Sequence, residues 1–347
     1  LRKEISYMNH TGSGTSRFHL QKSLMEEGHL FKLICGAGNE DAEEVYKLCL
    51  VYTLAGTNSI DMSANIDVVK AAKKGINDAE KLLDKFNITN YVKPYLTVSI
   101  GMPGDHHVRK AKIIEDKCTE CDACIPVCPT DAIPDILTII ESRCIGCGAC
   151  GVACQDDAIG YSHKQIEIES ILTECIEEGV ENIELHASVI DDEPVLHEWS
   201  IVNKINPKGF NSVCIDRGYL SNHALKIRIE KMLELCNDRM IVQADGIPMS
   251  GGSDDYRTTL QAVACADIVD KFSLPVHILL SGGTNSQSIK LSQSCDVPFA
   301  GVSIGTYARH LVYEYINDPN FPDEAILNSA VGIAKSLVDT CLNERES

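Results

Sequence analysis

Positive charge is scarce in this chain. Its 347 residues include 31 Lys and Arg against 50 Asp and Glu, which gives a formal net charge of −19. Nucleic acids and anionic membrane surfaces are bound by clustered Lys and Arg, and the sequence offers no such cluster. The charge balance therefore argues against both as partners and favours basic or metal-bearing proteins.

Long apolar runs are also lacking. No stretch of 18 or more uncharged apolar residues occurs, so the sequence predicts no membrane span. With 44% hydrophobic residues, the composition is typical of a soluble globular protein. The chain starts at Leu1 instead of Met, and residues 1–22 are polar around the flexible stretch Thr11–Gly14. We expect a flexible leader there, of the kind that remains after a targeting segment is removed, although an arbitrary start would look the same.

Cysteine, in contrast, is abundant, with sixteen residues, of which eight form two rows. Each row has the spacing C-x2-C-x2-C-x3-C, and Pro129 follows the first row. This spacing is typical of bacterial-type ferredoxin modules with two 4Fe–4S clusters, in which the fourth Cys of a row binds the cluster of the other row. The predicted ligand sets are Cys118, Cys121 and Cys124 with Cys154, and Cys144, Cys147 and Cys150 with Cys128.

Other uses of these cysteines agree less well with the sequence. Zinc sites take four ligands with a longer gap between pairs, so eight evenly spaced cysteines would overfill one tetrahedron. Disulfides need an oxidising compartment, and a chain of this size and apolar content does not depend on them. The cysteines outside the rows fall largely in apolar patterns, where a buried thiol acts as a small hydrophobe. They are Cys35, Cys49, Cys175, Cys214, Cys236, Cys265, Cys295 and Cys341, and only Cys35 stands out as a candidate site residue.

Outside the rows, short β-rich runs alternate with longer helical patterns, which predicts parallel βα units. Eight units in succession predict a closed (β/α)8 barrel. Asn39 is the expected N-cap of the first helix after strand one, which Gly56 should end, and Gly179 should end a later helix. The predicted strands are Leu30–Cys35, Ser59–Ser63, Tyr95–Ile100, Asn182–His186, Asn211–Ile215, Met240–Ala244, Val276–Leu280 and Phe299–Ser303.

The third unit is interrupted by the cysteine rows. Its strand ends at Ile100, but its helix, predicted at Lys164–Glu178, follows only after the rows. We therefore expect a leader at 1–22, barrel units one to three at 23–101, an inserted ferredoxin-like module at 102–163, and barrel units four to eight with a C-terminal helix at 164–347. Because strand-to-helix loops emerge at the face where barrels bind ligands, the module should lie over that mouth. The rows repeat after 26 residues, each followed by Asp-Ala-Ile, which predicts a pseudo-two-fold module.

Glycine-rich loops follow predicted strands seven and eight, at Ser281–Asn285 and Ser303–Arg309. Barrels hold phosphate groups with such loops, because glycine lets the backbone approach and a helix start offers free N–H groups. The candidate ligands for FMN or another phosphorylated molecule are Gly282, Gly283, Thr284, Gly305, Thr306 and Arg309. Two alternatives remain open: the glycines serve the backbone turn only, and Arg309 belongs to a surface ion pair.

Polar residues at the other strand ends are further candidates for the barrel mouth. The segment Gln243–Gly252 has the composition of a shaped loop across it, although Asp245 could equally cap a turn. No catalytic triad can be argued from residue spacing alone. The strand-end candidates are Lys32, Cys35, Asp61, His186, Asp216, Arg217, Gln243 and Asp245.

Several segments of the chain resemble one protein family over residues 23–315. The matching segments are Leu30–Ala37, Tyr52–Ala64, Met240–Gly251, Leu280–Asn285 and Phe299–Leu311, which flank the two cysteine rows. The chain resembles the light-dependent period family, LdpA, of cyanobacteria and its relatives in plastids. The resemblance implies an iron–sulfur protein in the light or redox input to a circadian clock, associated with clock proteins and without an established reaction. It transfers the cluster cysteines and no catalytic residue.

Three functions are consistent with these observations. The first is a redox protein, more sensor or carrier than enzyme, whose two 4Fe–4S clusters exchange electrons with a protein partner and report photosynthetic electron flow. The second is a barrel oxidoreductase in which the clusters supply electrons to a flavin or phosphorylated ligand. The third is a structural iron–sulfur subunit of a larger photosynthetic or plastid complex. The resemblance predicts the chloroplast stroma as location, with the cyanobacterial cytoplasm as the alternative.

Overall fold

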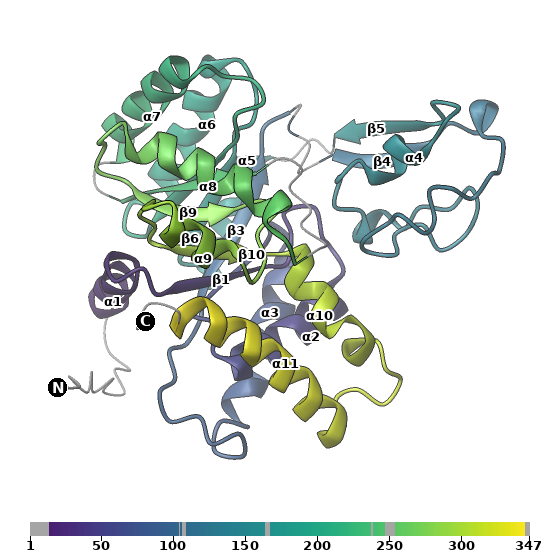
Figure 1. Cartoon of the computed structure of the whole chain (residues 1–347), viewed down its shortest axis with the longest axis horizontal. Coiled ribbons are helices and arrows are strands. Elements are labelled where there is room, and N and C mark those ends of the chain that lie inside the picture. The colour runs from purple at the N-terminus through teal and green to yellow at the C-terminus, as the bar shows by residue number, and fades with distance from the viewer. Residues whose placement is uncertain are drawn as a thin grey trace.

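A computed structural model describes residues 14–103, 105, 109–163, 167–236, 239–246 and 254–343. Two parts are visible in Figure 1, a large barrel and a smaller module that projects from it. The predicted segments 1–13 of the leader and 247–252 of the mouth loop lie outside the described residues.

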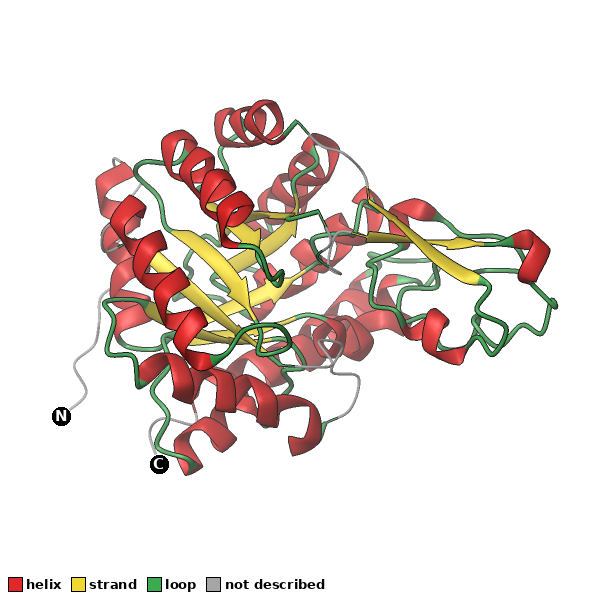
Figure 2. Ribbon diagram, turned by 90° about the horizontal axis from the view of Figure 1, so that it is seen from above, coloured by secondary structure: helices red, strands yellow, loops and turns green. Residues whose placement is uncertain are grey.

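Eight parallel strands form a closed barrel with the order β1-β10-β9-β8-β7-β6-β3-β2. Most of their residues are buried, because one face points into the barrel and the other is covered by helices, as Figure 2 shows. The predicted barrel is confirmed, and the strand ends differ from the prediction by no more than two residues. The strands are β1 (Leu30–Ile34), β2 (Ser59–Ser63), β3 (Tyr95–Gly101), β6 (Asn182–His186), β7 (Asn211–Ile215), β8 (Met240–Asp245), β9 (His277–Ser281) and β10 (Gly301–Ile304).

Helices follow the strands around the outside of the barrel. They are α2 (Ala42–Ala55), α3 (Ile66–Glu80), α5 (Ile168–Glu177), α6 (Asp192–Ile205), α7 (Asn222–Cys236), α8 (Tyr256–Asp270), α9 (Ser288–Ser294), α10 (Thr306–Ile316) and α11 (Glu324–Asn343). Gly56 ends α2 in the left-handed region as predicted, at φ 101°. The predicted N-cap was wrong: Asp41 caps α2 by accepting a hydrogen bond from the Glu44 amide, while Asn39 accepts one from the Asp41 amide and shapes the preceding turn.

The N-terminal helix α1 (Gly14–Glu26) occupies part of the predicted leader. The Phe18 ring stacks on Phe210 with ring centroids 4.5 Å apart. The Arg17 guanidinium pairs with Glu181 and lies 4.1 Å from the Tyr95 ring centroid. The leader prediction therefore fails for residues 14–22, which are helical, and Phe18 and Leu20 pack against the apolar cluster at the bottom of the barrel.

Among the described helices, α11 alone has the length and hydropathy of a membrane span, judged by composition only. One of its faces, which includes Ala330, Ala334 and Val338, is buried, and the helix contacts α2 and α10. A core helix of a globular protein has the same features, so α11 is weak evidence for a membrane span.

The inserted module lies between β3 and α5. Its two-stranded antiparallel sheet joins β4 (Arg109–Ile113) to β5 (Ile159–His163), and the loops between them carry η1 (Glu115–Lys117), η2 (Glu141–Arg143) and α4 (Ala149–Ala153). Figure 2 shows this sheet beside the barrel. Two residues predicted to belong to the module pack with the barrel instead. Met102 is buried in the barrel core, and the buried Asp105 accepts a hydrogen bond of 2.9 Å from the Ser188 amide.

Candidate functional site

The eight row cysteines line two separate cavities in the module. Cys118, Cys121, Cys124 and Cys154 line the first, which we call the distal cavity. Cys128, Cys144, Cys147 and Cys150 line the second, which we call the proximal cavity because it adjoins the barrel. The fold thus gathers the same two groups of four that the row spacing predicts as ligand sets. None of these cysteines forms a disulfide.

The two rows have equivalent backbone structure. The Ala132 amide donates to Cys128 Sγ at 3.2 Å, and the Ala158 amide donates to Cys154 Sγ at 3.3 Å. Asp131 and Asp157, which precede these alanines, both have positive φ, at 46° and 51°. This turn points an amide at the fourth sulfur of each row. Amide donors pointing at sulfur stabilise thiolate charge, so the local structure suits metal-bound cysteines.

The chemistry of the donor sets also fits an iron–sulfur cluster. Burial, together with the neighbouring Cys147 and Cys144 thiols, raises the pKa of Cys150 to about 11. Four thiolates in one small cavity repel one another unless cations balance their charge. Iron supplies that charge and binds thiolates. The residues of both cavities therefore fit 4Fe–4S clusters.

The surroundings of the two cavities differ. Apolar side chains that include Ile133, Ile139 and Tyr161 line the proximal cavity, and Cys144 and Cys150 are buried. The distal cavity has an exposed cysteine, Cys121, and acidic side chains in its wall. Solvent access tunes the reduction potential of a cluster, so clusters in these cavities would have different potentials.

A third cavity lies at the mouth of the barrel. The glycine loops after β9 and β10 supply much of its wall, and the module supplies Ile145 and Cys147. All six predicted ligand residues line it: Gly282, Gly283, Thr284, Gly305, Thr306 and Arg309. Of the mouth candidates, Cys35, His186 and Asp245 line it, whereas Lys32, Asp61 and Gln243 are buried without reaching its wall, and Asp216 and Arg217 are not part of it.

The loop after β9 depends on glycine. Gly282 and Gly283 have φ values of 58° and 74°. A Cβ atom at Gly282 would lie 2.8 Å from the Gly246 nitrogen, so only glycine allows this contact between two loops. Gly305 precedes α10, whose N-terminus has no side-chain cap. Backbone N–H groups at the start of α10 thus lie beside the cavity, as an anion site requires.

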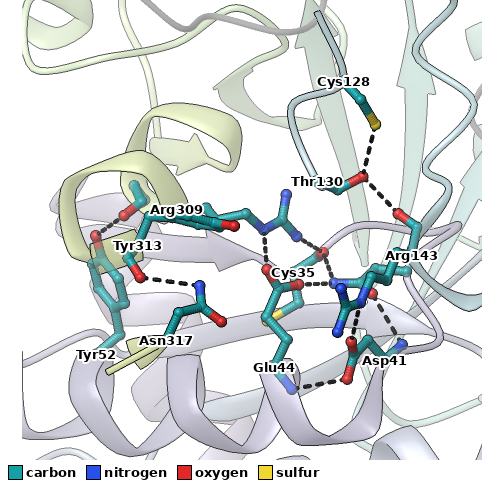
Figure 3. Close-up of polar contacts among 12 residues, drawn as sticks. Cys35, Asp41, Glu44, Tyr52, Cys128, Thr130, Arg143, Arg309, Tyr313 and Asn317 are labelled. Carbon is teal, nitrogen blue, oxygen red and sulfur yellow. Dashed lines mark hydrogen bonds and ion pairs between the residues drawn. The ribbon is translucent and has the colours of Figure 1, made fainter. Parts of the chain in front are cut away.

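Arg309 is held by its neighbours on the barrel side of the mouth. Figure 3 shows its guanidinium between Glu44 and Cys35. Its Nε lies 3.0 Å from Glu44 Oε1, and its Nη2 donates to the Cys35 carbonyl at 2.6 Å. The predicted ion pair is therefore present but buried. A ligand in the mouth would meet a guanidinium whose charge is already balanced.

Polar contacts connect the proximal cavity to the barrel through the loop after β1, as Figure 3 shows in part. Thr130 Oγ1 lies 3.8 Å from Cys128 Sγ and donates to the Arg143 carbonyl at 2.8 Å. Arg143 Nε in turn donates to Asp41 Oδ2 at 2.9 Å, next to α2. Lys110 Nζ donates to the Cys144 carbonyl at 2.9 Å and also to Gly38 of the same loop. These contacts orient the module over the mouth.

A buried polar cluster lies at the floor of the mouth. Lys32 Nζ donates to Glu184 Oε2, which also accepts from Ser212 Oγ at 3.1 Å. Cys214 Sγ donates to Glu184 Oε1 at 3.0 Å, and His186 Nε2 lies 3.4 Å from the same oxygen. Burial alone would raise the pKa of Glu184, but the Lys32 ammonium outweighs it and lowers the pKa to about 2.

Sequence reasoning missed Glu184 and interpreted Cys214 as a small hydrophobe, which is wrong in this surrounding. The signal for Glu184 was its position two residues before His186 on one strand, which puts both side chains on the inner face. Cys214 had no comparable signal. It meets His186 only through the register of β6 against β7, in which these two residues are paired.

Comparisons with known proteins agree with these features. Residues 175–340 match the model of the Light dependent period A C-terminal domain family. Residues 111–133 and 137–160 each match the model of a 4Fe–4S binding domain.

Light dependent period A of Synechococcus elongatus is 29% identical over 328 residues, which cover 92% of this chain and 90% of that protein. The resemblance predicted from the sequence is confirmed: the chain carries two 4Fe–4S binding motifs and is similar to Light dependent period A over most of its length.

Solved structures resemble the chain more distantly. The YdjI aldolase of Escherichia coli K12 has a TM-score of 0.49 at 10% identity, with 95% of each chain covered. Tryptophan synthase subunit alpha of Legionella pneumophila has a TM-score of 0.44 at 10% identity, with 93% of this chain and 98% of that chain covered. Likeness at this level carries no argument about chemistry.

Proposed function

We propose that this LdpA-type protein is an electron-transfer or redox-sensing protein with two 4Fe–4S clusters, held by the distal and proximal sets of cysteines. The observation that carries the proposal is the arrangement of the three cavities. Cys121 of the distal set is exposed, while Cys147 of the proximal set lines the barrel mouth. Clusters in these cavities would form a path from the outer surface of the module to the mouth, and light-driven electron flow is the source of electrons that the family resemblance favours.

The surface around the distal cavity suits a basic redox protein as partner. Ile136 and Leu137, which line the cavity, are 37% and 43% exposed. Glu120, Asp122 and Asp156 line the same cavity and are exposed. An apolar centre with charges of one sign around it steers a partner of opposite charge and leaves a dry contact near the cluster. A location in the chloroplast stroma stays a prediction, and the relative with 29% identity comes from a cyanobacterium.

Electron transfer to a basic haem protein tests this function. The dithionite-reduced protein should reduce the haem in stopped-flow measurements, with a rate that falls as salt concentration rises. Glu120→Lys should slow the bimolecular rate by about tenfold at low salt, because the charge near the distal cavity changes sign. Asp270→Lys, an exposed change at the far end of α8, is the matched control and should change it little. Clusters that resist dithionite, or equal rates for both variants, would contradict the proposal.

A second candidate function is a barrel oxidoreductase, favoured by the contact of Cys147 with the mouth cavity. A phosphorylated ligand or FMN at the start of α10 would lie beside the proximal cluster. Thr306→Asp should weaken binding of FMN or inorganic phosphate by at least about tenfold, since it adds a negative charge among the N–H groups. Thr306→Asn has nearly the same shape without the charge and should bind as the wild type does. Isothermal titration calorimetry measures both, and absence of binding to the wild type would rule out this candidate.

A further inference from the structure

Three metal-binding side chains meet at the floor of the barrel mouth. Glu184, His186 and Cys214 are all buried, and all three line the mouth cavity. Cys214 Sγ lies 3.0 Å from Glu184 Oε1 and 4.0 Å from His186 Nε2, and the two latter atoms are 3.4 Å apart.

These separations suit a tetrahedral ion. Zinc binds sulfur at about 2.3 Å and nitrogen or oxygen at about 2.0–2.1 Å, so ligand atoms of a tetrahedral site stand about 3.3–3.6 Å apart. The three distances scatter around that range and need shifts of about half an ångström to reach it. The donors come from two adjacent strands of the barrel, which hold their backbones rigidly in register.

Further ionisable groups are buried at the floor of the mouth. The carboxylates of Asp61, Glu184 and Asp245 are buried in the described part of the barrel. Lys32 interacts with Glu184 and Asp61, while Arg309 is balanced by Glu44.

We propose that Glu184, His186 and Cys214 hold a divalent transition-metal ion, zinc by preference, with its fourth position open to the mouth cavity. A set of one sulfur, one imidazole and one carboxylate selects zinc or its neighbours over magnesium and calcium. Three protein ligands and one open position form the arrangement of zinc sites that bind a water or a substrate oxygen. Cys214 loses its thiol proton to solvent when the ion binds.

Surrounding residues support this ligand set. Gln243 Nε2 donates to Cys214 Sγ at 3.3 Å, and Ser303 Oγ donates to Gln243 Oε1 at 2.9 Å. Lys32 and Ser212 bond to Oε2 of Glu184, which leaves Oε1 toward His186 and Cys214. Such outer contacts orient metal ligands. The site is independent of the proposed electron transfer, and a carbonyl or oxyanion of a small ligand is the chemical group it would bind.

Zinc content and zinc K-edge absorption of the full-length protein, purified anaerobically and equilibrated with Zn²⁺, test the proposal. The wild type should hold about one zinc per chain in addition to its iron, with one sulfur at about 2.3 Å and nitrogen or oxygen ligands at about 2.0–2.1 Å. Cys214→Ser and His186→Gln should each weaken zinc binding at least about 100-fold and leave iron content unchanged. Cys236→Ser, another buried cysteine, is the matched control and should keep the zinc.

Three results would overturn the proposal. The first is a wild-type protein without tightly bound zinc, and the second is a zinc content that both substitutions leave unchanged. The third is a zinc ion bound by four sulfurs, because such an ion would lie among the cysteine rows. Since one of the two variants could fail to fold, circular dichroism of each is measured first, and either folded variant suffices. Cys147→Ala should lose iron but keep the zinc, which separates this site from the clusters.

Discussion

Removal of Cys154 is expected to damage the cluster of the first row, although Cys154 belongs to the second. In Cys154→Ala the iron content should fall from about eight to about four atoms per chain, because the fourth ligand of the distal set is gone. The physical reason is the fold of the module, in which Cys154, at the C-terminal end of α4, lines the same cavity as Cys118, Cys121 and Cys124. Iron and sulfide analysis under anaerobic conditions measures the loss.

Paramagnetic resonance of the reduced variants identifies which cluster is lost. Cys154→Ala should give the spectrum of Cys121→Ala, and Cys128→Ala should give that of Cys147→Ala. If the fourth cysteine of each row bound the cluster of its own row, Cys154→Ala would instead give the spectrum of Cys147→Ala, and Cys128→Ala that of Cys121→Ala. Cys236→Ala, outside both cavities, should keep all the iron and serves as the control. A wild type with about four irons would contradict the two-cluster assignment itself.

The barrel and the two cysteine groups were predictable because their signals are local. A strand such as Asn211–Ile215 is a short apolar run between turns, and the rows have a spacing that few other sites use. The N-cap of α2 was missed by two residues because Asn39 and Asp41 are both good caps, and only the path of the loop decides between them. The helix at residues 14–26 was missed since its few apolar residues give no clear period.

The floor of the mouth depends on contacts between distant parts of the chain. Lys32 and Glu184 lie 152 residues apart, and no pattern near either predicts the other. The same holds for Arg309 and Glu44: a surface ion pair of Arg309 was one open alternative, without a named partner, and the observed pair is buried. Strand register and loop packing create these pairs, so they follow only from the three-dimensional structure.

Deletion of the module is expected to leave a folded barrel. Arg109 and His163 are opposite each other at the open end of the β4–β5 pair, so the two ends of the deleted segment lie at neighbouring positions. A short Gly-Ser linker in place of residues 109–163 can therefore join them. All barrel strands and their covering helices lie outside this range. Thermal unfolding followed by circular dichroism should show one cooperative transition, with a midpoint lowered by a few degrees because contacts such as Arg143 with Asp41 are lost.

The position of the cut provides a sharper test of where the barrel ends. A deletion that starts at Met102 also removes a side chain from the barrel core and the Asp105 carboxylate that accepts from the Ser188 amide. Loss of a buried Met side chain costs about 2–5 kcal/mol, and an unsatisfied buried amide adds to that cost. We therefore expect the deletion of 102–163 to unfold at clearly lower denaturant concentration than the deletion of 109–163. Equal midpoints would show that Met102 and Asp105 do not stabilise the barrel, and absence of a cooperative transition in both would show that barrel and module fold only together.

The isolated module should unfold when its iron is removed, because its own apolar core, around Ala132 and Ile133, is too small to offset chain entropy without metal.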